Sequence, residues 1–334
     1  MNRSASPSLF GYDFQVNAAI VLMLENIEQL DTLRVEGAKE DIEIKLNDNT
    51  YVLAQAKSVV NSSSDFKEVK QKFKKALASL SDAANTIKSV RQLIYITNSP
   101  NPLNDKASFP LFYGAAHRSI SSLPESTRNM VNCYLSKIDN ALDPSLLTIQ
   151  ILPFETNDEK ERYKEVLRVI SDFLDGFDLP IEGLRKRLHK IWKDSLHFNS
   201  SQTDISIVLK KKDIVWPVIV CVTEKGAIER DGPYCSNLDE NEYGLIQRKY
   251  HELIDSCSER FEFAIKVISE YNNYPNKTKD GIALFVADKW DSFSNEFDFN
   301  CVDERVKEAL IKVIVSTVLR NRLEINEIKK KVKL

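Results

Sequence analysis

The sequence has few cysteines and glycines and no apolar run of membrane-spanning length. Its five cysteines are far apart in 334 residues and show no CxxC or CxH spacing. We therefore expect reduced thiols in a cytoplasmic protein and no structural zinc site. The apolar patch at 18–24 is too short for a signal peptide or a membrane span, so no membrane association is expected. The absence of a GxxxxGKS or GxxxxGKT loop argues against a P-loop ATPase.

Charge of either sign is nearly balanced, with a formal net charge of −3 and a pI of about 6.0. The overall field does not attract nucleic acid, so DNA contacts would have to come from local basic patches. Residues 67–75 are rich in lysine, and Lys67, Lys70 and Lys74 are candidate phosphate contacts. A second basic segment spans 185–193. Both segments also fit solvated helix faces.

The length favours about two domains. Apolar residues recur at helical spacing over 12–30 and again over 65–88. Short β-branched runs, bounded by turn residues, predict four strands in the first hundred residues. These strands are expected at 33–35, 42–46, 51–57 and 93–97. This pattern predicts an α/β core.

The remaining sequence predicts a helix-rich C-terminal region. Residues 108–146 are expected to be mostly helical, and 145–154 to contain a strand. Two β-branched runs lie within 204–224, where Pro217 would mark a strand edge or bulge. We place a first domain at 1–165 and an α-rich (α+β) module at 175–334.

Polar residues occupy fixed positions on two of the predicted strands. Asp41 opens the run "DIEIKL", and Gln55 and Lys57 lie two residues apart in "YVLAQAK". Side chains at i and i+2 share one face of a strand. A hairpin centred near 48–49 pairs residue numbers that sum to about 97, which places Asp41 opposite residue 56 and lets it converge with both Gln55 and Lys57.

A carboxylate, an amide oxygen and an ammonium group at one end of a sheet suit metal-assisted phosphodiester cleavage. Mg²⁺ or Mn²⁺ would bind Asp41 and an oxygen of Gln55, because these ions prefer hard oxygen ligands. Lys57 would orient or deprotonate the attacking water, or stabilise charge on the phosphate. Taken singly, an aspartate at a strand start is usually a turn residue and a strand lysine usually protects an edge.

The segments "GYDFQVNAAIVLML", "VEGAKEDIEIKL" and "VLAQAKS" together resemble the PD-(D/E)xK nuclease superfamily. The resemblance covers residues 8–100 and is closest to nuclease domains of bacterial anti-phage effectors of the CBASS and Lamassu types, above all the Lamassu nuclease subunit. It implies a restriction-endonuclease-like mixed sheet flanked by helices. It also implies catalytic roles for Asp41, Gln55 and Lys57, with Gln15 as the polar residue on the preceding helix.

The helix position departs from the family pattern, which often has glutamate where this chain has Gln15. Glu36 or Glu40 is then a candidate source of the missing negative charge, although both also fit solvated loop acids. Glu43 shares a strand face with Asp41 and is a further, weaker candidate.

The resemblance implies a Mg²⁺-dependent endonuclease that degrades double-stranded DNA and is controlled by assembly. The expected partners are an SMC-like ATPase, an accessory subunit and further copies of the chain. Two alternatives remain. One is a catalytically inactive DNA-binding or scaffold subunit, and the other is a sequence-specific restriction endonuclease.

Overall fold

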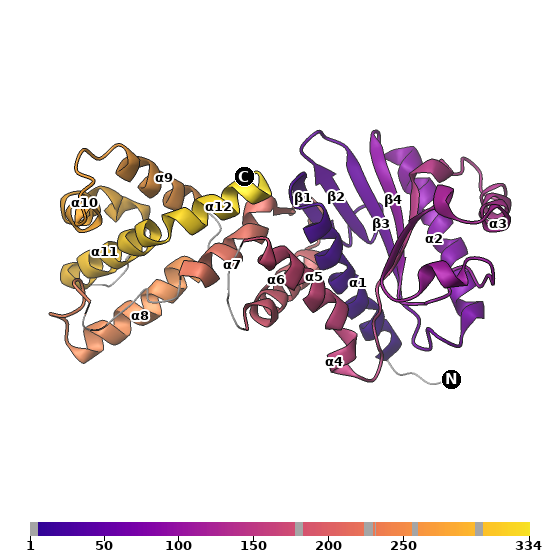
Figure 1. Cartoon of the computed structure of the whole chain (residues 1–334), viewed down its shortest axis with the longest axis horizontal. Helices are drawn as coiled ribbons and strands as arrows, with labels where there is room; N and C mark the ends of the chain where they lie inside the picture. The colour runs from indigo at the N-terminus through magenta and orange to yellow at the C-terminus, as the bar shows by residue number, and fades with distance from the viewer. Residues whose placement is uncertain (1–5, 178–182, 224–229, 231, 256–259, 298–302) are drawn as a thin grey trace. The chain divides into compact units, whose positions relative to one another are not determined.

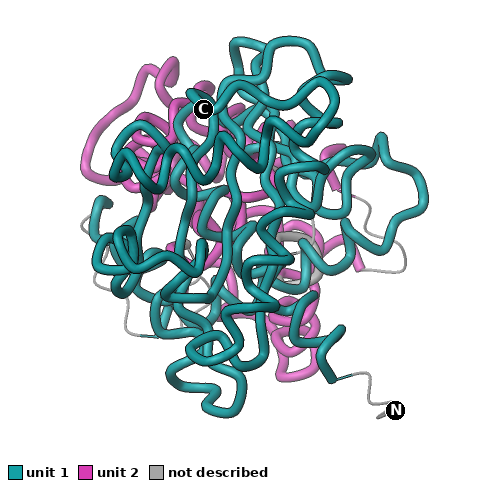
Figure 2. The backbone as a smooth tube through the Cα atoms, turned by 90° about the vertical axis from the view of Figure 1, so that its right-hand side faces the viewer, with its two compact units in different colours: residues 1–211 teal, residues 212–334 magenta. Residues whose placement is uncertain are grey.

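The computed structural model describes residues 6–177, 183–223, 230, 232–255, 260–297 and 303–334. The chain divides into two compact units, residues 1–211 and 212–334, which are coloured separately in Figure 2. The first unit is therefore longer than the expected domain of 1–165, because the helices after residue 164 pack onto it. Among the described residues, no helix is long and apolar enough to cross a membrane.

A seven-stranded mixed sheet in the order β5-β6-β4-β3-β2-β1-β7 forms the centre of unit 1. Its strands are β1 (Leu30–Val35), β2 (Ile42–Leu46), β3 (Tyr51–Lys57), β4 (Val90–Thr97), β5 (Ala116–Ser119), β6 (Leu147–Ile151) and β7 (Leu209–Lys210). β3, β4 and β6 are mutually parallel, and the other neighbours pair antiparallel. An α/β fold with a mixed sheet is thus confirmed.

Helices cover both faces of this sheet (Figure 1). The α-helices of unit 1 are α1 (Ser6–Glu25), α2 (Phe66–Thr86), α3 (Glu125–Leu135), α4 (Glu159–Arg162), α5 (Lys164–Asp175) and α6 (Leu184–Ser201). Short 3₁₀ helices are η1 (Phe109–Phe112), η2 (Ile120–Ser122) and η3 (Pro144–Leu146). α2 connects the parallel strands β3 and β4 and packs on both, forming a βαβ unit.

Helix α1 is apolar around its circumference, and its residues from Phe14 to Leu24 are buried. Such a helix must be covered on more than one side. The sheet contacts it through β1, β2 and β3, and α5 and α6 also pack against it. The side chain of Asp65 caps the first turn of α2 by accepting from the Glu68 N–H at 3.0 Å.

Unit 2 is helical in all of its described elements. They are α7 (Lys211–Thr223), α8 (Glu240–Asp255), α9 (Arg260–Asn272), α10 (Gly281–Lys289), η4 (Trp290–Glu296), α11 (Glu304–Arg320) and α12 (Arg322–Val332). The apolar face of α11 contacts α8, α9, α10 and η4. Phe263, Phe285 and Phe293 form an aromatic cluster, with neighbouring ring centroids 5.8 and 6.3 Å apart.

Two expectations about secondary structure are wrong. The β-branched run at 214–222 lies in α7 rather than in a strand, and Pro217 lies inside that helix. Burial of Val215, Val218 and Ile219 outweighs the strand propensity of these residues. Residues 108–146 contain one α-helix, α3, together with 3₁₀ turns and strand β5. Of the cysteines, Cys133, Cys221 and Cys235 are not in disulfide bonds, and Cys257 and Cys301 lie outside the described residues.

Buried Arg34 connects the sheet to the end of α6. Its guanidinium donates to the carbonyls of Asn199, Gln202 and Ile207 at 2.6, 2.7 and 2.8 Å. Carbonyl groups at a helix C-terminus carry partial negative charge and favour a cation. Arg34 is only 4% exposed, so this contact holds α6 in the first unit and explains the later boundary.

We predict that Arg34→Leu lowers the free energy of unfolding by about 3 kcal/mol, because it leaves several carbonyls without a donor. Arg34→Lys should lose less, because it retains one charged donor. Urea unfolding of the full chain measures both values. Arg91→Ala is the control: Arg91 forms an exposed pair with Asp48, and its loss should change stability by under about 0.5 kcal/mol. Equal effects of Arg34→Leu and Arg91→Ala would contradict this role.

Candidate active site

The candidate site lies where β3 and β4 end and β2 begins. β2 runs antiparallel to β3, and β3 runs parallel to β4, so these three ends meet at one edge of the sheet. Open α/β sheets commonly bind ligands outside the carboxyl ends of their parallel strands. Ile42 pairs with Ala54, so the numbers of paired residues in this hairpin sum to 96. This is one less than the sum of 97 expected from the sequence.

Asp41 and Lys57 meet at this edge. Asp41 Oδ2 accepts from Lys57 Nζ at 2.8 Å and from the Ala56 backbone N–H at 3.0 Å. The two charged side chains are 16% and 31% exposed. The carboxylate is thus fixed by two donors, while both side chains of the pair remain partly accessible to solvent.

Gln55 lies behind this pair and contacts a different acid. Its Nε2 donates to Glu40 Oε2, and both side chains are buried. The other carboxyl oxygen of Glu40, Oε1, has no hydrogen-bond partner among the described residues. The Ser79 hydroxyl is close enough to lower the pKa of Glu40, but it does not form a hydrogen bond with Oε1.

Burial raises the pKa of Glu40 to about 7. The hydrogen bond from Gln55 opposes this shift, and the negative charge of Asp41 adds to it. Glu40 therefore changes protonation near neutral pH. Two consecutive acids thus have different surroundings, since Asp41 has an ammonium partner and Glu40 is only 3% exposed.

A tight turn holds the two acids side by side. Glu43 Oε1 accepts from the N–H groups of Lys39 and Glu40 at 2.6 and 3.1 Å. A Cβ on Gly37 would lie 2.3 Å from Glu43 Cδ, so any larger residue would displace the Glu43 carboxylate that holds the turn. Within the part of the chain that the structure describes, the Glu43 carboxylate forms no hydrogen bond with Asp41, and it holds the turn instead.

Gln15 reaches the site from helix α1. Its Nε2 donates to the backbone carbonyl of Asp41 at 3.1 Å, and the Glu36 backbone N–H donates to the same oxygen at 2.9 Å. Gln15 thus positions Asp41 through its main chain. The Glu36 side chain is exposed, and among the described residues it forms no contact with Asp41, Gln55 or Lys57.

The three lysines proposed to bind DNA lie on α2. The ammonium groups of Lys70 and Lys74 are 5.8 and 4.6 Å from the centre of the Tyr134 ring on α3, and Lys67 is exposed. Lys72, which we did not select from the sequence, is closer to the site. It donates to the carbonyl of Ser58, the residue after Lys57.

Glu40 is one of the two candidates that the sequence offers for the missing negative charge, and the structure buries it at the site, whereas Glu36 is exposed. The run "KEDIE" gives no sign that its first acid is buried and its second is not. The closest signal was Gln55, because a buried amide on a strand needs a polar partner.

Glu40 and Asp41 fit a divalent metal ion. Mg²⁺ is usually held by one or two carboxylates and keeps several waters. The unpartnered, buried Oε1 of Glu40 and the carboxylate of Asp41 supply such oxygens. No group of three or more histidine, cysteine or acidic side chains that could hold a metal occurs in the described part of the chain.

No protein-family model and no curated protein matches this chain. Among solved structures it is similar to the Acinetobacter baumannii Cap4 SAVED/CARF-domain containing receptor with the cyclic trinucleotide 2'3'3'-cAAA. The identity is 17% and the TM-score 0.39, over 66% of this chain and 48% of that one. The Moraxella osloensis Cap4 SAVED/CARF-domain containing receptor gives 16% and 0.38, over 64% and 48%. The chain thus spans about half the length of these receptors. TM-scores this low do not allow a function to be inferred for this chain.

We predict that Glu40→Gln stabilises the protein at pH 8 by about 2–3 kcal/mol and has little effect at pH 5. A carboxyl whose pKa is raised from 4.5 to about 7 on folding keeps its proton in the folded state while the unfolded chain loses it. Stability from this group therefore falls as pH rises from 4.5 to 7. Glu40→Gln does not titrate, so its stability does not fall over this pH range for this reason. Urea unfolding at both pH values checks the difference.

Glu36→Gln is the matched control for this measurement, because Glu36 is an exposed acid in the same turn. Its effect on stability should be small and equal at pH 5 and pH 8. A Glu40→Gln effect that does not change between the two pH values would show that Glu40 is ionised in both states.

Proposed function

We propose that this chain is a metal-dependent DNA endonuclease that serves as an effector of bacterial anti-phage defence. The observation that carries the proposal is the convergence of Asp41, Lys57 and buried Glu40 at one sheet edge. An acid at the start of one strand and a glutamine-x-lysine on the next is the arrangement of the PD-(D/E)xK nucleases that the sequence resembles. A mixed sheet with helices on both faces is compatible with a restriction-endonuclease-like fold.

Each residue has a separate task in this proposal. Asp41 and Glu40 would hold Mg²⁺ or Mn²⁺, which when bound activates water and neutralises phosphate charge. Lys57, fixed beside Asp41, would orient the attacking water and stabilise negative charge on the phosphate. Gln15 keeps the Asp41 backbone in place, and Lys72, which pairs with Glu68 and donates to the Ser58 carbonyl, would contact the DNA backbone beside the strand end.

The defence role rests on the sequence resemblance. A nuclease of low sequence specificity has to be inactive in uninfected cells, so we propose control by assembly through unit 2. In a Lamassu-like system the partners would be an SMC-like ATPase and an accessory subunit. Cleavage of both strands needs two sites, and further copies of this chain would supply the second.

A specific observation favours a second candidate, a catalytically inactive DNA-binding or scaffold subunit. Both glutamines of the candidate site act as hydrogen-bond donors in the structure. Only two acids of the site, Glu40 and Asp41, are then left as charged ligands. The scaffold alternative predicts DNA binding that survives Lys57→Ala and no metal-dependent cleavage.

We predict that the protein nicks or linearises plasmid DNA with Mg²⁺ or Mn²⁺, and that Lys57→Ala lowers the rate at least about 100-fold. Asp41→Asn should have a similar effect, because it removes a metal ligand and the partner of Lys57. Gel analysis across protein concentrations also tests assembly, since a steep rise in rate with concentration indicates that several copies act together. A discrete fragment pattern on genomic DNA would favour a restriction enzyme.

Lys45→Ala is the matched control for the cleavage assay. Lys45 also lies on the sheet and pairs with an aspartate, Asp31, at 3.5 Å, but on an exposed surface. Its loss should leave cleavage unchanged. Equal cleavage rates of wild type and Lys57→Ala would place the reaction elsewhere. If Lys45→Ala lowered the cleavage rate as much as Lys57→Ala, the effect would come from the loss of positive charge in general.

We also predict that millimolar Mg²⁺ or Mn²⁺ raises the melting temperature at pH 8 and that Asp41→Asn abolishes this rise. An ion that binds only the folded state stabilises it by mass action. Differential scanning calorimetry with Ca²⁺-free buffers gives the shift without needing an active nuclease. A shift that persists in Asp41→Asn would exclude this site as the metal site.

A further inference from the structure

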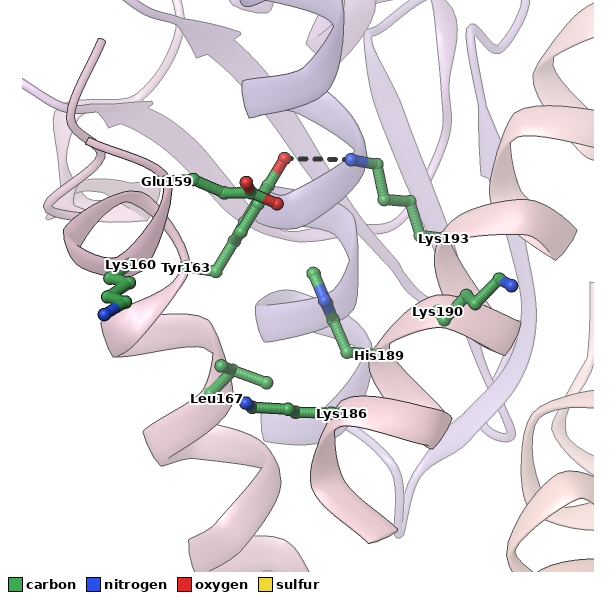
Figure 3. A pocket seen from close by; sticks show the side chains of 8 residues that line it. All are labelled: Glu159, Lys160, Tyr163, Leu167, Lys186, His189, Lys190 and Lys193. Atoms are coloured by element: carbon green, nitrogen blue, oxygen red, sulfur yellow. Dashed lines mark hydrogen bonds between the residues drawn. The ribbon is translucent and has the colours of Figure 1, made fainter. Parts of the chain in front are cut away.

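A basic cleft of about 530 Å³ lies outside the candidate active site, between α4 and α5 on one side and α6 on the other. Figure 3 shows Tyr163 and Leu167 extending from one side and Lys186 and His189 from the other, with Lys160 and Lys190 at the outer margins. Its volume is in the range of small-molecule sites in proteins.

The inner wall of the basic cleft is held in place by helix α1. Lys193 Nζ pairs with Asp13 at 2.6 Å and donates to the Tyr163 hydroxyl at 3.0 Å. His189 Nε2 donates to Asn17 Oδ1 at 2.7 Å. Burial and the nearby Lys193 charge lower the pKa of His189 to about 4, so the ring is neutral at pH 7. The wall is therefore preformed, and its charges are paired.

The unpaired positive charge lies at the rim. Lys160, Lys186 and Lys190 have no acidic partner among the described residues, and all three are exposed. Lys186 and Lys190 are four residues apart on α6, so they share one face of that helix. In Figure 3 Lys186 extends toward Leu167, and Lys160 lies across the cleft from Lys190. Three ammonium groups around a concave site suit a ligand with several negative charges.

Three other residues of the lining restrict the class of ligand. Glu159 is an exposed acid in the lining, and it disfavours an anion that fills the whole cleft. A carboxylate instead accepts hydrogen bonds from hydroxyl or amino groups. Leu167 and the ring of Tyr163 provide apolar surface. The ligand should thus combine a phosphate end with a part that is apolar and carries hydrogen-bond donors.

We propose that the basic cleft binds a ribonucleotide, with its phosphates on Lys160, Lys186 and Lys190 and its sugar or base toward Glu159 and Leu167. Duplex DNA fits the basic cleft less well than a ribonucleotide does. Its backbone would bring phosphate against Glu159, and its base amino groups are engaged in pairing. The proposal is independent of the nuclease proposal, because the cleft contains none of the residues of the candidate active site.

Isothermal titration calorimetry of the full chain with ADP in EDTA tests the proposal, because chelation removes metal from the candidate active site. We expect binding that Lys186→Ala/Lys190→Ala weakens at least about tenfold. Both lysines are exposed and unpaired, so the double variant should fold normally. Absence of heat up to millimolar ADP would overturn the proposal.

Lys88→Ala/Lys137→Ala is the matched control, because it removes two exposed lysines of unit 1 that lie outside the basic cleft. It should leave ADP binding unchanged, as should Lys57→Ala. An equal loss in the control would mean general electrostatic attraction and would overturn the assignment. So would tighter binding of a short DNA duplex that depends on Lys186 and Lys190.

Pyrophosphate separates a ribonucleotide site from a bare anion site. Wild type should bind ADP more tightly than pyrophosphate, and Glu159→Gln should narrow that difference. If Glu159 acted only by repelling anions, Glu159→Gln would raise the affinities for ADP and pyrophosphate by the same factor. Equal affinities of wild type for the two ligands would overturn the ribonucleotide assignment.

Discussion

The burial of helix α1 on more than one side is the constraint on which unit 1 depends. A polar side chain on such a helix needs a partner, because an unpaired buried group is costly. Asp13, Gln15 and Asn17 are the polar residues in its middle turns. Each determines the position of a neighbouring element: Asp13 that of Lys193, Gln15 that of Asp41, and Asn17 that of His189.

These three partners lie on two sides of the helix. Residues 13 and 17 are one turn apart and share a face, and residue 15 is rotated about 200° from residue 13. α1 therefore fixes the backbone of Asp41 on its sheet side and packs α6 on the other. This arrangement explains why the first unit extends to residue 211, well beyond the sheet.

Local patterns predicted much of the sheet and the central pair of the site. Apolar and polar residues alternate strictly in 42–46, and a turn follows. Together they predict the hairpin register to within one residue, and that register brings Asp41 to Lys57. The path of the chain after residue 164 was not predictable in this way. It depends on Arg34 and Asn17, which read as ordinary polar residues and find their partners more than 160 positions later.

The burial of Glu40 could not be predicted, for a related reason. Its burial results from the turn that Gly37 and Glu43 stabilise and from the amide of Gln55 beneath it. None of these contacts has a periodic signal. The same limit applies to α7, where Val215, Val218 and Ile219 are buried in a helix although the composition of the run is typical of a strand.

The glutamine at position 55 and the glutamate at position 40 are best understood as a pair. A glutamate at 55 would place a second carboxylate against Glu40 in a buried setting, and mutual repulsion would keep one of them protonated. Glutamine instead offers an N–H to Glu40 and retains a free carbonyl oxygen. In the nuclease that we propose, Glu40, in the turn before the neighbouring strand, would take the place of the acid that many nucleases carry on this strand. Glu40 and Asp41 would then supply two carboxylates at this edge although residue 55 is neutral, and a glutamine at this position would be compatible with metal-dependent catalysis.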